Sequence, residues 1–148
     1  MAIKILIMGL PGCGKTTLAK RLAKQLQAVH FNADEVRANI NDDLGFSTAD
    51  RGKQASRMGW LCDQVNKAGH NAIADFVCPT EATREAFGDR DILIWMDNLR
   101  ESRYDNTNRI FEPPEDADVV IDYFDVTQYA VDEGTVNRAL GEILEQLV

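Results

Sequence analysis

The fold of this chain is decided by Gly9-Leu10-Pro11-Gly12-Cys13-Gly14-Lys15-Thr16, which follows directly on the apolar run of residues 3–8. The stretch fits the pattern G-x-x-x-x-G-K-[ST] of a phosphate-binding loop (P-loop) between a strand and a helix. Its glycines let backbone N–H groups turn inward around an anion, since no Cβ stands in the way. Lys15 would bring a positive charge to the β- and γ-phosphates of a nucleoside triphosphate, and the Thr16 hydroxyl is suited to bind Mg²⁺. We expect ATP to be bound by Gly9, Pro11, Gly12, Cys13, Gly14, Lys15, Thr16 and Thr17.

Length and charge narrow the class of protein. A chain of 148 residues is expected to form a single domain, residues 1–148. Its net charge of −8 argues against general binding to nucleic acid or to an anionic membrane, because both need a basic face. Three cysteines without C-x-x-C spacing predict reduced thiols and a cytoplasmic setting. Residues 3–8 are too few to span a bilayer, so no membrane segment is expected.

Strands and helices are expected to alternate along the chain. Expected strands cover residues 3–8, 28–32, 71–77, 92–96 and 117–121, and expected helices cover 16–27, 34–40, 48–67, a short segment after Thr80 and a closing segment from Val136 to Leu147. This order predicts a three-layer α/β/α fold of the P-loop NTPase type, with a five-stranded and mostly parallel sheet. Ligands of such sheets bind at the carboxyl ends of the strands, where Asp34, Asp75 and Asp97 would lie. The polar segment 97–116 is expected to be a loop, with room for one helical turn, that forms a lid.

Small-molecule kinases, GTP switches and motor ATPases all share a P-loop. A GTP switch would carry Asn-Lys-x-Asp after a strand, whereas Asn66-Lys67-Ala68-Gly69 lacks the acid and precedes a strand. A motor ATPase would carry a pair of acids after a long apolar strand, whereas Asp75 stands alone before Phe76. A kinase needs a loop for the donor, an acid near the acceptor hydroxyl and a lid with arginine. The chain offers all three, with Asp34 as the candidate base.

Several motifs, in order along the chain, resemble those of the adenylylsulfate kinases, a family of P-loop kinases. At the family's spacing stand Asn32-Ala33-Asp34-Glu35-Val36-Arg37, Asp43-Leu44-Gly45-Phe46-Ser47 and Asp50-Arg51. Phe76-Val77-Cys78-Pro79 is similar to the family's Phe-Ile-Ser-Pro, and Phe111-Glu112-Pro113-Pro114-Glu115 to its Tyr-Glu-x-Pro. The likeness covers nearly the whole chain. It implies transfer of the γ-phosphoryl group of ATP to the 3′-hydroxyl of adenylylsulfate, with Mg²⁺ at Thr16.

The resemblance also implies a role for each matching residue. Asp34 would face the acceptor's 3′-hydroxyl, and Phe46 would stack on its adenine. Arg37 and Arg51 would hold its phosphosulfate, as suits arginine forks. The implied substrate contacts are Asp34, Arg37, Phe46, Arg51, Gln54, Phe76, Val77 and Cys78. The expected partner is thus a small molecule, and a homodimer is compatible with the resemblance.

The chain departs from the family at three places. Cys78 stands where the family has Ser, and Gln54 where it has Asn. The family's lid contains Arg-Asp followed by Lys-Gly-Leu-Tyr, whereas residues 100–111 are shorter and contain no lysine. The lid candidates are Arg100, Arg103, Arg109 and Phe111, and the sequence does not choose among the arginines. Two other functions stay open: a kinase acting on a nucleoside, sugar or antibiotic hydroxyl, and a non-catalytic ATP-binding module.

The four main candidates for acceptor binding also have structural interpretations. Asp34 is suited to cap a helix, and Phe46 to pack in the core. Arg37 and Arg51 are equally typical of solvated charges on helices.

Other reactive or aromatic residues are expected to be structural. Cys78 is interpreted as a small buried residue rather than a nucleophile, because His30 and His70 are placed at strand starts, opposite the active edge. Trp60 and Trp95 are expected in the core.

Overall fold

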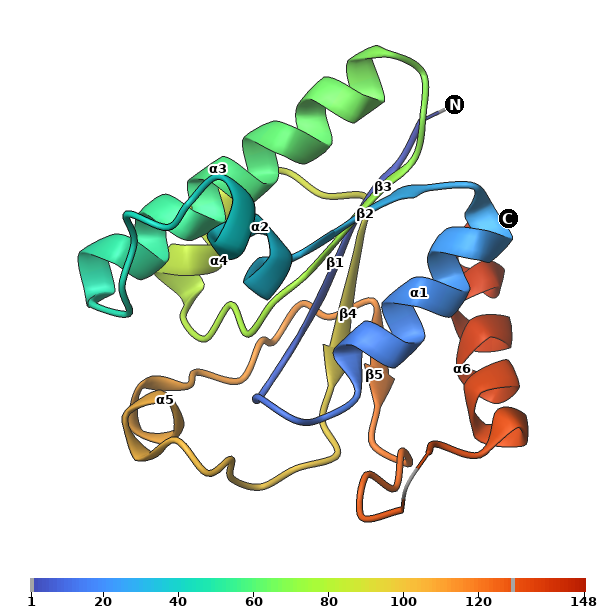
Figure 1. Ribbon diagram of the computed structural model, residues 1–148. Helices are drawn as coiled ribbons and strands as arrows, with labels where there is room; N and C mark the ends of the chain where they lie inside the picture. Colours follow the sequence, from blue (N-terminus) through green and yellow to red (C-terminus); the bar gives the residue numbers. More distant parts are fainter. Residues whose placement is uncertain (1, 129) are drawn as a thin grey trace.

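The computed structural model describes residues 2–128 and 130–148, which form three layers (Figure 1). The central sheet has the strand order β2-β3-β1-β4-β5 and is parallel at every pairing. Its strands are β1 (Lys4–Gly9), β2 (Val29–Asn32), β3 (Ala72–Asp75), β4 (Ile92–Met96) and β5 (Val119–Ile121). The helices are α1 (Lys15–Leu26), α2 (Ala33–Asn39), α3 (Thr48–Lys67), α4 (Glu81–Phe87), α5 (Asp105–Ile110) and α6 (Glu133–Glu145). The predicted α/β fold with a parallel five-stranded sheet is confirmed.

Strand β1 is buried along its whole length, because helices cover the sheet from both sides. Figure 1 shows α1 and α6 on one side of the sheet and α2, α3 and α4 on the other. Alternate residues of β1 divide between these layers. Ile5 and Ile7 belong to the core on the α1 and α6 side, and Leu6 and Met8 to the core on the α3 side. This division explains why the run before the P-loop is apolar at nearly every position.

Local capping chemistry fixes where two of the helices begin. Helix α4 follows Thr80, whose hydroxyl accepts the Thr83 N–H at 3.1 Å, while the Thr83 hydroxyl accepts the Thr80 N–H at 3.0 Å. This reciprocal pair is a capping box, which satisfies two backbone donors at once. Helix α3 occupies the predicted residues and is capped by Ser47, whose hydroxyl accepts the Asp50 N–H at 3.1 Å.

Trp60 does not lie in the core, so that expectation is wrong. It is 61% exposed, because α3 turns Ala55, Met58 and Cys62 toward the sheet and leaves Trp60 on its outer face. Trp95 is half-buried and packs against the same layer of the core.

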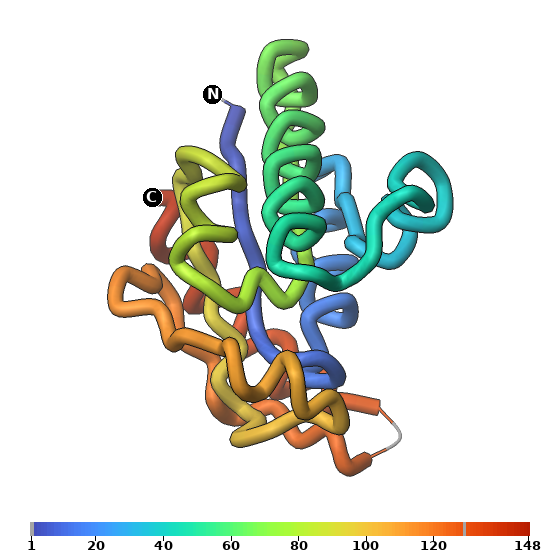
Figure 2. The backbone as a smooth tube through the Cα atoms, turned by 90° about the vertical axis from the view of Figure 1, so that its left-hand side faces the viewer, coloured from blue at the N-terminus to red at the C-terminus, as the bar shows by residue number. Residues whose placement is uncertain are grey.

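Strand β3 is shorter than expected, and the lid contains a short helix. β3 ends at Asp75 instead of residue 77, and the chain then leaves the sheet and reaches Cys78 at a φ of 47°. Within the lid, α5 is the short helical segment that the sequence analysis allowed for. In Figures 1 and 2 the lid lies beside the P-loop, at the carboxyl end of the sheet. No helix among the described residues combines the length and the apolar character that crossing a membrane requires.

Helices α3 and α4 meet at Gly59, which gives a test of the packing. A Cβ at this position would stand 1.9 Å from the Phe87 carbonyl oxygen, which belongs to backbone and cannot move aside cheaply. We expect Gly59→Ala to lower the free energy of unfolding by about 3 kcal/mol, the upper end of the usual cost of overpacking. Urea denaturation followed by circular dichroism measures this change.

Gly52 is the matched control on the same helix. A Cβ there would meet no atom within 4 Å. Gly52→Ala should therefore raise the free energy of unfolding by about 0.5–1 kcal/mol, through helix propensity alone. Equal effects of the two substitutions would contradict the close contact at Gly59.

Candidate active site

A cavity of about 1330 Å³ opens at the carboxyl end of the sheet. One wall is the P-loop with the first turn of α1, and the opposite wall is lid residues 101–107 with Leu99. The floor comes from the ends of β2 and β3, and Phe46 and Arg51 stand at one side. Val126, Gln128, Ala130 and Val131, from the segment after β5, complete the rim. The cavity thus joins segments from the whole length of the chain.

The P-loop has the backbone that anion binding requires. Gly12 and Gly14 adopt positive φ values of 85° and 100°, a conformation that L side chains rarely adopt. Helix α1 begins after Gly14 with no side-chain cap, so its first N–H groups are left for a ligand. The Lys15 ammonium donates to the Leu10 carbonyl oxygen at 3.1 Å and approaches the Cys13 sulfur at 3.7 Å. Lys15 is therefore already folded over the loop.

Cys13 is a buried thiol within this loop. Burial raises the pKa of Cys13, while the neighbouring Lys15 charge works in the opposite direction. The thiol therefore stays protonated at neutral pH, and its sulfur packs under Gly9. Gly9 and Cys13 shape the loop from behind, whereas Pro11, Gly12, Gly14, Lys15, Thr16 and Thr17 line the cavity.

Beside Thr16 lies a group of polar side chains, of which the sequence analysis placed only Asp75 at the ligand-binding end of the sheet. The Asp75 carboxylate, 1% exposed, accepts the Thr16 hydroxyl at 3.3 Å. The Asn32 amide donates to Thr16 Oγ1 at 3.1 Å and to both Asp75 oxygens at 3.3 Å. His30 Nε2 also bonds to Asp75 Oδ2. The placement of His30 opposite the active edge is therefore wrong, because its ring reaches across to the end of β3.

Asp34 lines the cavity and is not the cap of its helix. That role belongs to Asn32, whose Oδ1 accepts the Glu35 N–H at 3.1 Å. The capping interpretation of Asp34 is therefore wrong. Asp34 is exposed, and within the described residues its carboxylate makes no hydrogen bond. It is thus available to a ligand hydroxyl.

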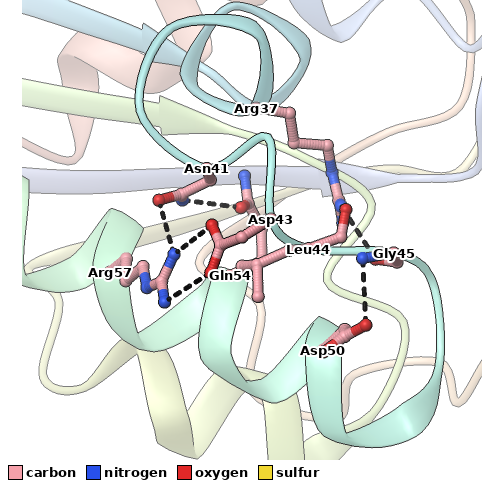
Figure 3. Close-up of polar contacts among 8 residues, drawn as sticks. All are labelled: Arg37, Asn41, Asp43, Leu44, Gly45, Asp50, Gln54 and Arg57. Atoms are coloured by element: carbon pink, nitrogen blue, oxygen red, sulfur yellow. Dashed lines mark hydrogen bonds and ion pairs between the residues drawn. The ribbon is translucent and has the colours of Figure 1, made fainter.

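The turn before α3 is held in shape by a network of polar contacts (Figure 3). Arg37 donates to the carbonyl oxygens of Leu44 and Gly45, at 3.3 and 2.8 Å, and the Gly45 N–H donates to Asp50 at 2.9 Å. From the other side, Arg57 binds Asp43 with two nitrogens, at 3.0 and 3.2 Å. These contacts give the turn a defined shape.

Gln54 and Asn41 form the buried part of this network (Figure 3). The Asn41 amide donates to Gln54 Oε1 at 2.8 Å, and Asn41 Oδ1 accepts from Arg57 at 2.9 Å. Gln54 is buried and does not line the cavity. Its side chain holds the turn, and its expected contact with the substrate stays a prediction.

The turn presents Phe46 as an exposed aromatic platform. Phe46 is 66% exposed, so its interpretation as a core residue is wrong. The guanidinium carbons of Arg37 and Arg51 lie 4.2 and 5.6 Å from the ring centroid, within cation–π range. Arg51 also donates to the Phe46 carbonyl oxygen at 3.1 Å and to the lid residue Thr107 at 3.0 Å. Phe46 and Arg51 line the cavity, whereas Arg37 stands behind Phe46.

The segment after β3 carries three candidates, of which two line the cavity. Phe76 and Val77 line the cavity, but Cys78 does not. Burial raises the pKa of Cys78 to about 12, which leaves a negligible thiolate fraction at neutral pH. The buried Arg84 donates to the carbonyl oxygens of Cys78 and Glu112, both at 2.9 Å, and so ties this segment to the end of the lid.

The lid arginines differ in where they point. Arg103 lines the cavity, whereas Arg100 and Arg109 do not. Phe111 packs against the core on the α3 side and so anchors the lid. The sequence offered no signal for this difference, which depends on the path of the lid backbone.

The family model for adenylylsulphate kinase matches residues 1–93 of this chain. The chain belongs to this family. A relative named adenylyl-sulfate kinase, from Synechococcus sp., is 34% identical over 88 residues, which are 56% of this chain and 50% of that protein. The adenylyl-sulfate kinase of Staphylococcus carnosus is 25% identical over 168 aligned positions, covering 94% of this chain and 80% of that protein.

The fold agrees with a solved structure of the same family. The Mycobacterium tuberculosis APS kinase CysC, solved in complex with AMPPNP and APS, superposes with a TM-score of 0.77. It shares 17% sequence identity and covers 99% of this chain and 97% of its own, so this likeness concerns the fold alone. The chain spans about half the length of the Synechococcus relative, and the family model ends before the lid begins.

Proposed function

We propose that this protein is an ATP-dependent kinase that transfers the γ-phosphoryl group to the 3′-hydroxyl of adenylylsulfate. The observation that carries the proposal is one cavity that joins the P-loop to Asp34 and to the exposed ring of Phe46. Phosphoryl transfer depends mainly on positioning and electrostatics, so a donor loop, an acid and an aromatic platform around one space are the parts it needs.

The donor half consists of the P-loop and the polar group behind it. Lys15 and the uncapped start of α1 supply positive charge to the triphosphate. Thr16 and Asp75 fit Mg²⁺, because hydroxyl and carboxylate oxygens are the ligands this ion prefers, and they lie side by side where the first turn of α1 meets the cavity floor. Bound there with the triphosphate, Mg²⁺ would neutralise charge on the transferred group.

The acceptor half consists of Asp34, Phe46 and Arg51. The Asp34 carboxylate would accept the proton of the attacking hydroxyl or orient that hydroxyl. Phe46 offers a face for a purine, with roughly 1–3 kcal/mol per stacked base in nucleic-acid analogues. Arg51 stands beside it as a partner for an oxyanion. Arg37 would support acceptor binding indirectly, because its bonds to the Leu44 and Gly45 carbonyl oxygens hold the turn that carries Phe46.

A kinase with a different hydroxyl acceptor is the second candidate. The lid wall of the cavity carries the acids Glu101 and Asp105 beside the cation Arg103. Such a mixed wall also suits a neutral, hydroxyl-rich acceptor such as a sugar or a nucleoside.

The association of this protein into a homodimer stays a prediction.

The two candidate functions are separated by measuring ADP release with ATP, Mg²⁺ and a panel of adenylylsulfate, nucleosides and sugars. We expect turnover with adenylylsulfate. Lys15→Ala should abolish it, because the triphosphate then loses its main cationic partner. Turnover with another panel member alone would replace the proposed acceptor, and nucleotide binding without any turnover would favour a non-catalytic module.

Asp34→Asn tests the proposed base. It keeps the size of the side chain but removes its charge, so we expect kcat to fall by about 10²–10⁴-fold while ATP affinity stays unchanged. Steady-state kinetics and calorimetric titration with an ATP analogue measure the two quantities. Glu35→Gln, on the next residue of α2 and outside the cavity, is the control. An unchanged kcat in Asp34→Asn would rule out Asp34 as the base.

Arg103→Ala tests the lid. If Arg103 reaches the transferred phosphoryl group, kcat should fall by up to about 10³-fold, the lower end of what an arginine finger supplies. Arg100→Ala and Arg109→Ala remove the same charge from the lid outside the cavity and should change kcat less than about threefold. Equal losses in all three variants would mean that only the net charge of the lid matters.

A further inference from the structure

His30 extends from the edge strand β2 to Asp75, which lines the floor of the cavity. Side chains alternate along a strand, so His30 and Asn32 share one face of the sheet, and the parallel register pairs Asn32 with Asp75. The His30 ring leans along its strand and bonds through Nε2 to Asp75 Oδ2. The side chains of His30 and Asp75 are 14% and 2% exposed. An ionised carboxylate oxygen only accepts, so Nε2 is the donor in a bond to such an oxygen.

The partners of Asp75 divide its two oxygens between them. Oδ2 is bound by His30, and Oδ1 accepts the Thr16 hydroxyl. Asn32 donates to both oxygens at 3.3 Å, so it does not favour one orientation of the carboxylate. His30 bonds only Oδ2, so it favours the orientation of the carboxylate in which Oδ1 faces Thr16.

The other partners are not placed to take over this role. Asn32 is fixed by its own Oδ1, which caps α2 through the Glu35 N–H. The Thr16 hydroxyl stands on the opposite side of the carboxylate, in the first turn of α1. Rotation about the Cβ–Cγ bond of an aspartate is soft, because this torsion has broad minima. Without His30, the carboxylate would be free to turn Oδ1 away from Thr16.

We infer that His30 is a positioning residue, which orients Asp75 so that one carboxylate oxygen serves Thr16 and the divalent cation of the bound nucleotide. The inference rests on the proposed binding of ATP with Mg²⁺. Mg²⁺ demands near-ideal octahedral geometry, so a rotated carboxylate affects it directly. Loss of such an outer partner usually weakens a metal site by about 10–100-fold. His30 therefore acts on the cation and not on the phosphate-binding backbone.

The test is calorimetric titration of a non-hydrolysable ATP analogue over a range of Mg²⁺ concentrations and in EDTA. In His30→Leu, the Mg²⁺ concentration that half-saturates nucleotide binding should rise by about 10–100-fold. Binding in EDTA should stay within about twofold of the unmodified protein, because the P-loop is intact. His30→Gln carries an N–H at a comparable distance from the backbone and should restore most of the Mg²⁺ response.

Two further variants separate positioning from general damage. His70→Leu replaces an exposed histidine just before β3 and should leave the Mg²⁺ response unchanged. In an Asp75→Asn background, His30→Leu should add less than about a twofold change, because its effect passes through the carboxylate.

Several outcomes would overturn the inference. An equal loss of affinity with and without Mg²⁺ would mean that His30 only supports the fold, and an unchanged Mg²⁺ response would mean that Asp75 needs no orientation. If His30→Gln did not restore the Mg²⁺ response, the hydrogen bond from His30 to Asp75 would not be the cause of the effect. Failure of the unmodified protein to bind the nucleotide would instead refute the proposed function, and the inference with it.

Discussion

The parallel register of β1 with its neighbours is the constraint on which the site depends. It pairs Ile7 with Asp75 on one side and Gly9 with Met96 on the other, and the register of β2 then brings Asn32 to Asp75. Because side chains alternate along a strand, a slip of one residue would turn Asp75 to the face away from Thr16. The apolar residues that fix the register in the core therefore also fix the chemistry at its edge.

The parts of the site that the sequence predicted are those that are local in the chain. The P-loop is continuous, so one short segment and the helix that begins within it place its glycine backbone, the Lys15 ammonium and the Thr16 hydroxyl. The positions of Asp34 and Phe46 follow from short motifs in the same way. The contact of His30 with Asp75 joins residues that are far apart in sequence, and it depends on the direction in which a long side chain leans from its strand.

The two features of α3 that the sequence analysis did not anticipate, the exposure of Trp60 and the buried partner of Gln54, have the same physical origin. Trp60 is apolar, but its exposure depends on which face of α3 packs against the sheet, and Gly59 sets that face through its contact with Phe87. Gln54 lies on the inner side of the same helix, where an amide needs buried partners, and it finds Asn41. In both cases helix packing decides the outcome, and the residue type alone does not.

The acceptor turn and the lid are linked by Arg51. Its guanidinium supports the ring of Phe46, binds the Phe46 carbonyl oxygen and donates to Thr107 in the lid. Thr107 is itself buried, so this hydrogen bond is partly shielded from water and is stronger than a fully exposed one. An anionic ligand that draws Arg51 toward itself would have to loosen either the turn or the lid. The free energy of binding such an acceptor therefore includes the free energy needed to disturb the turn or the lid. A neutral acceptor would leave the bond between Arg51 and Thr107 in place. The charge of the acceptor therefore decides whether binding disturbs the lid.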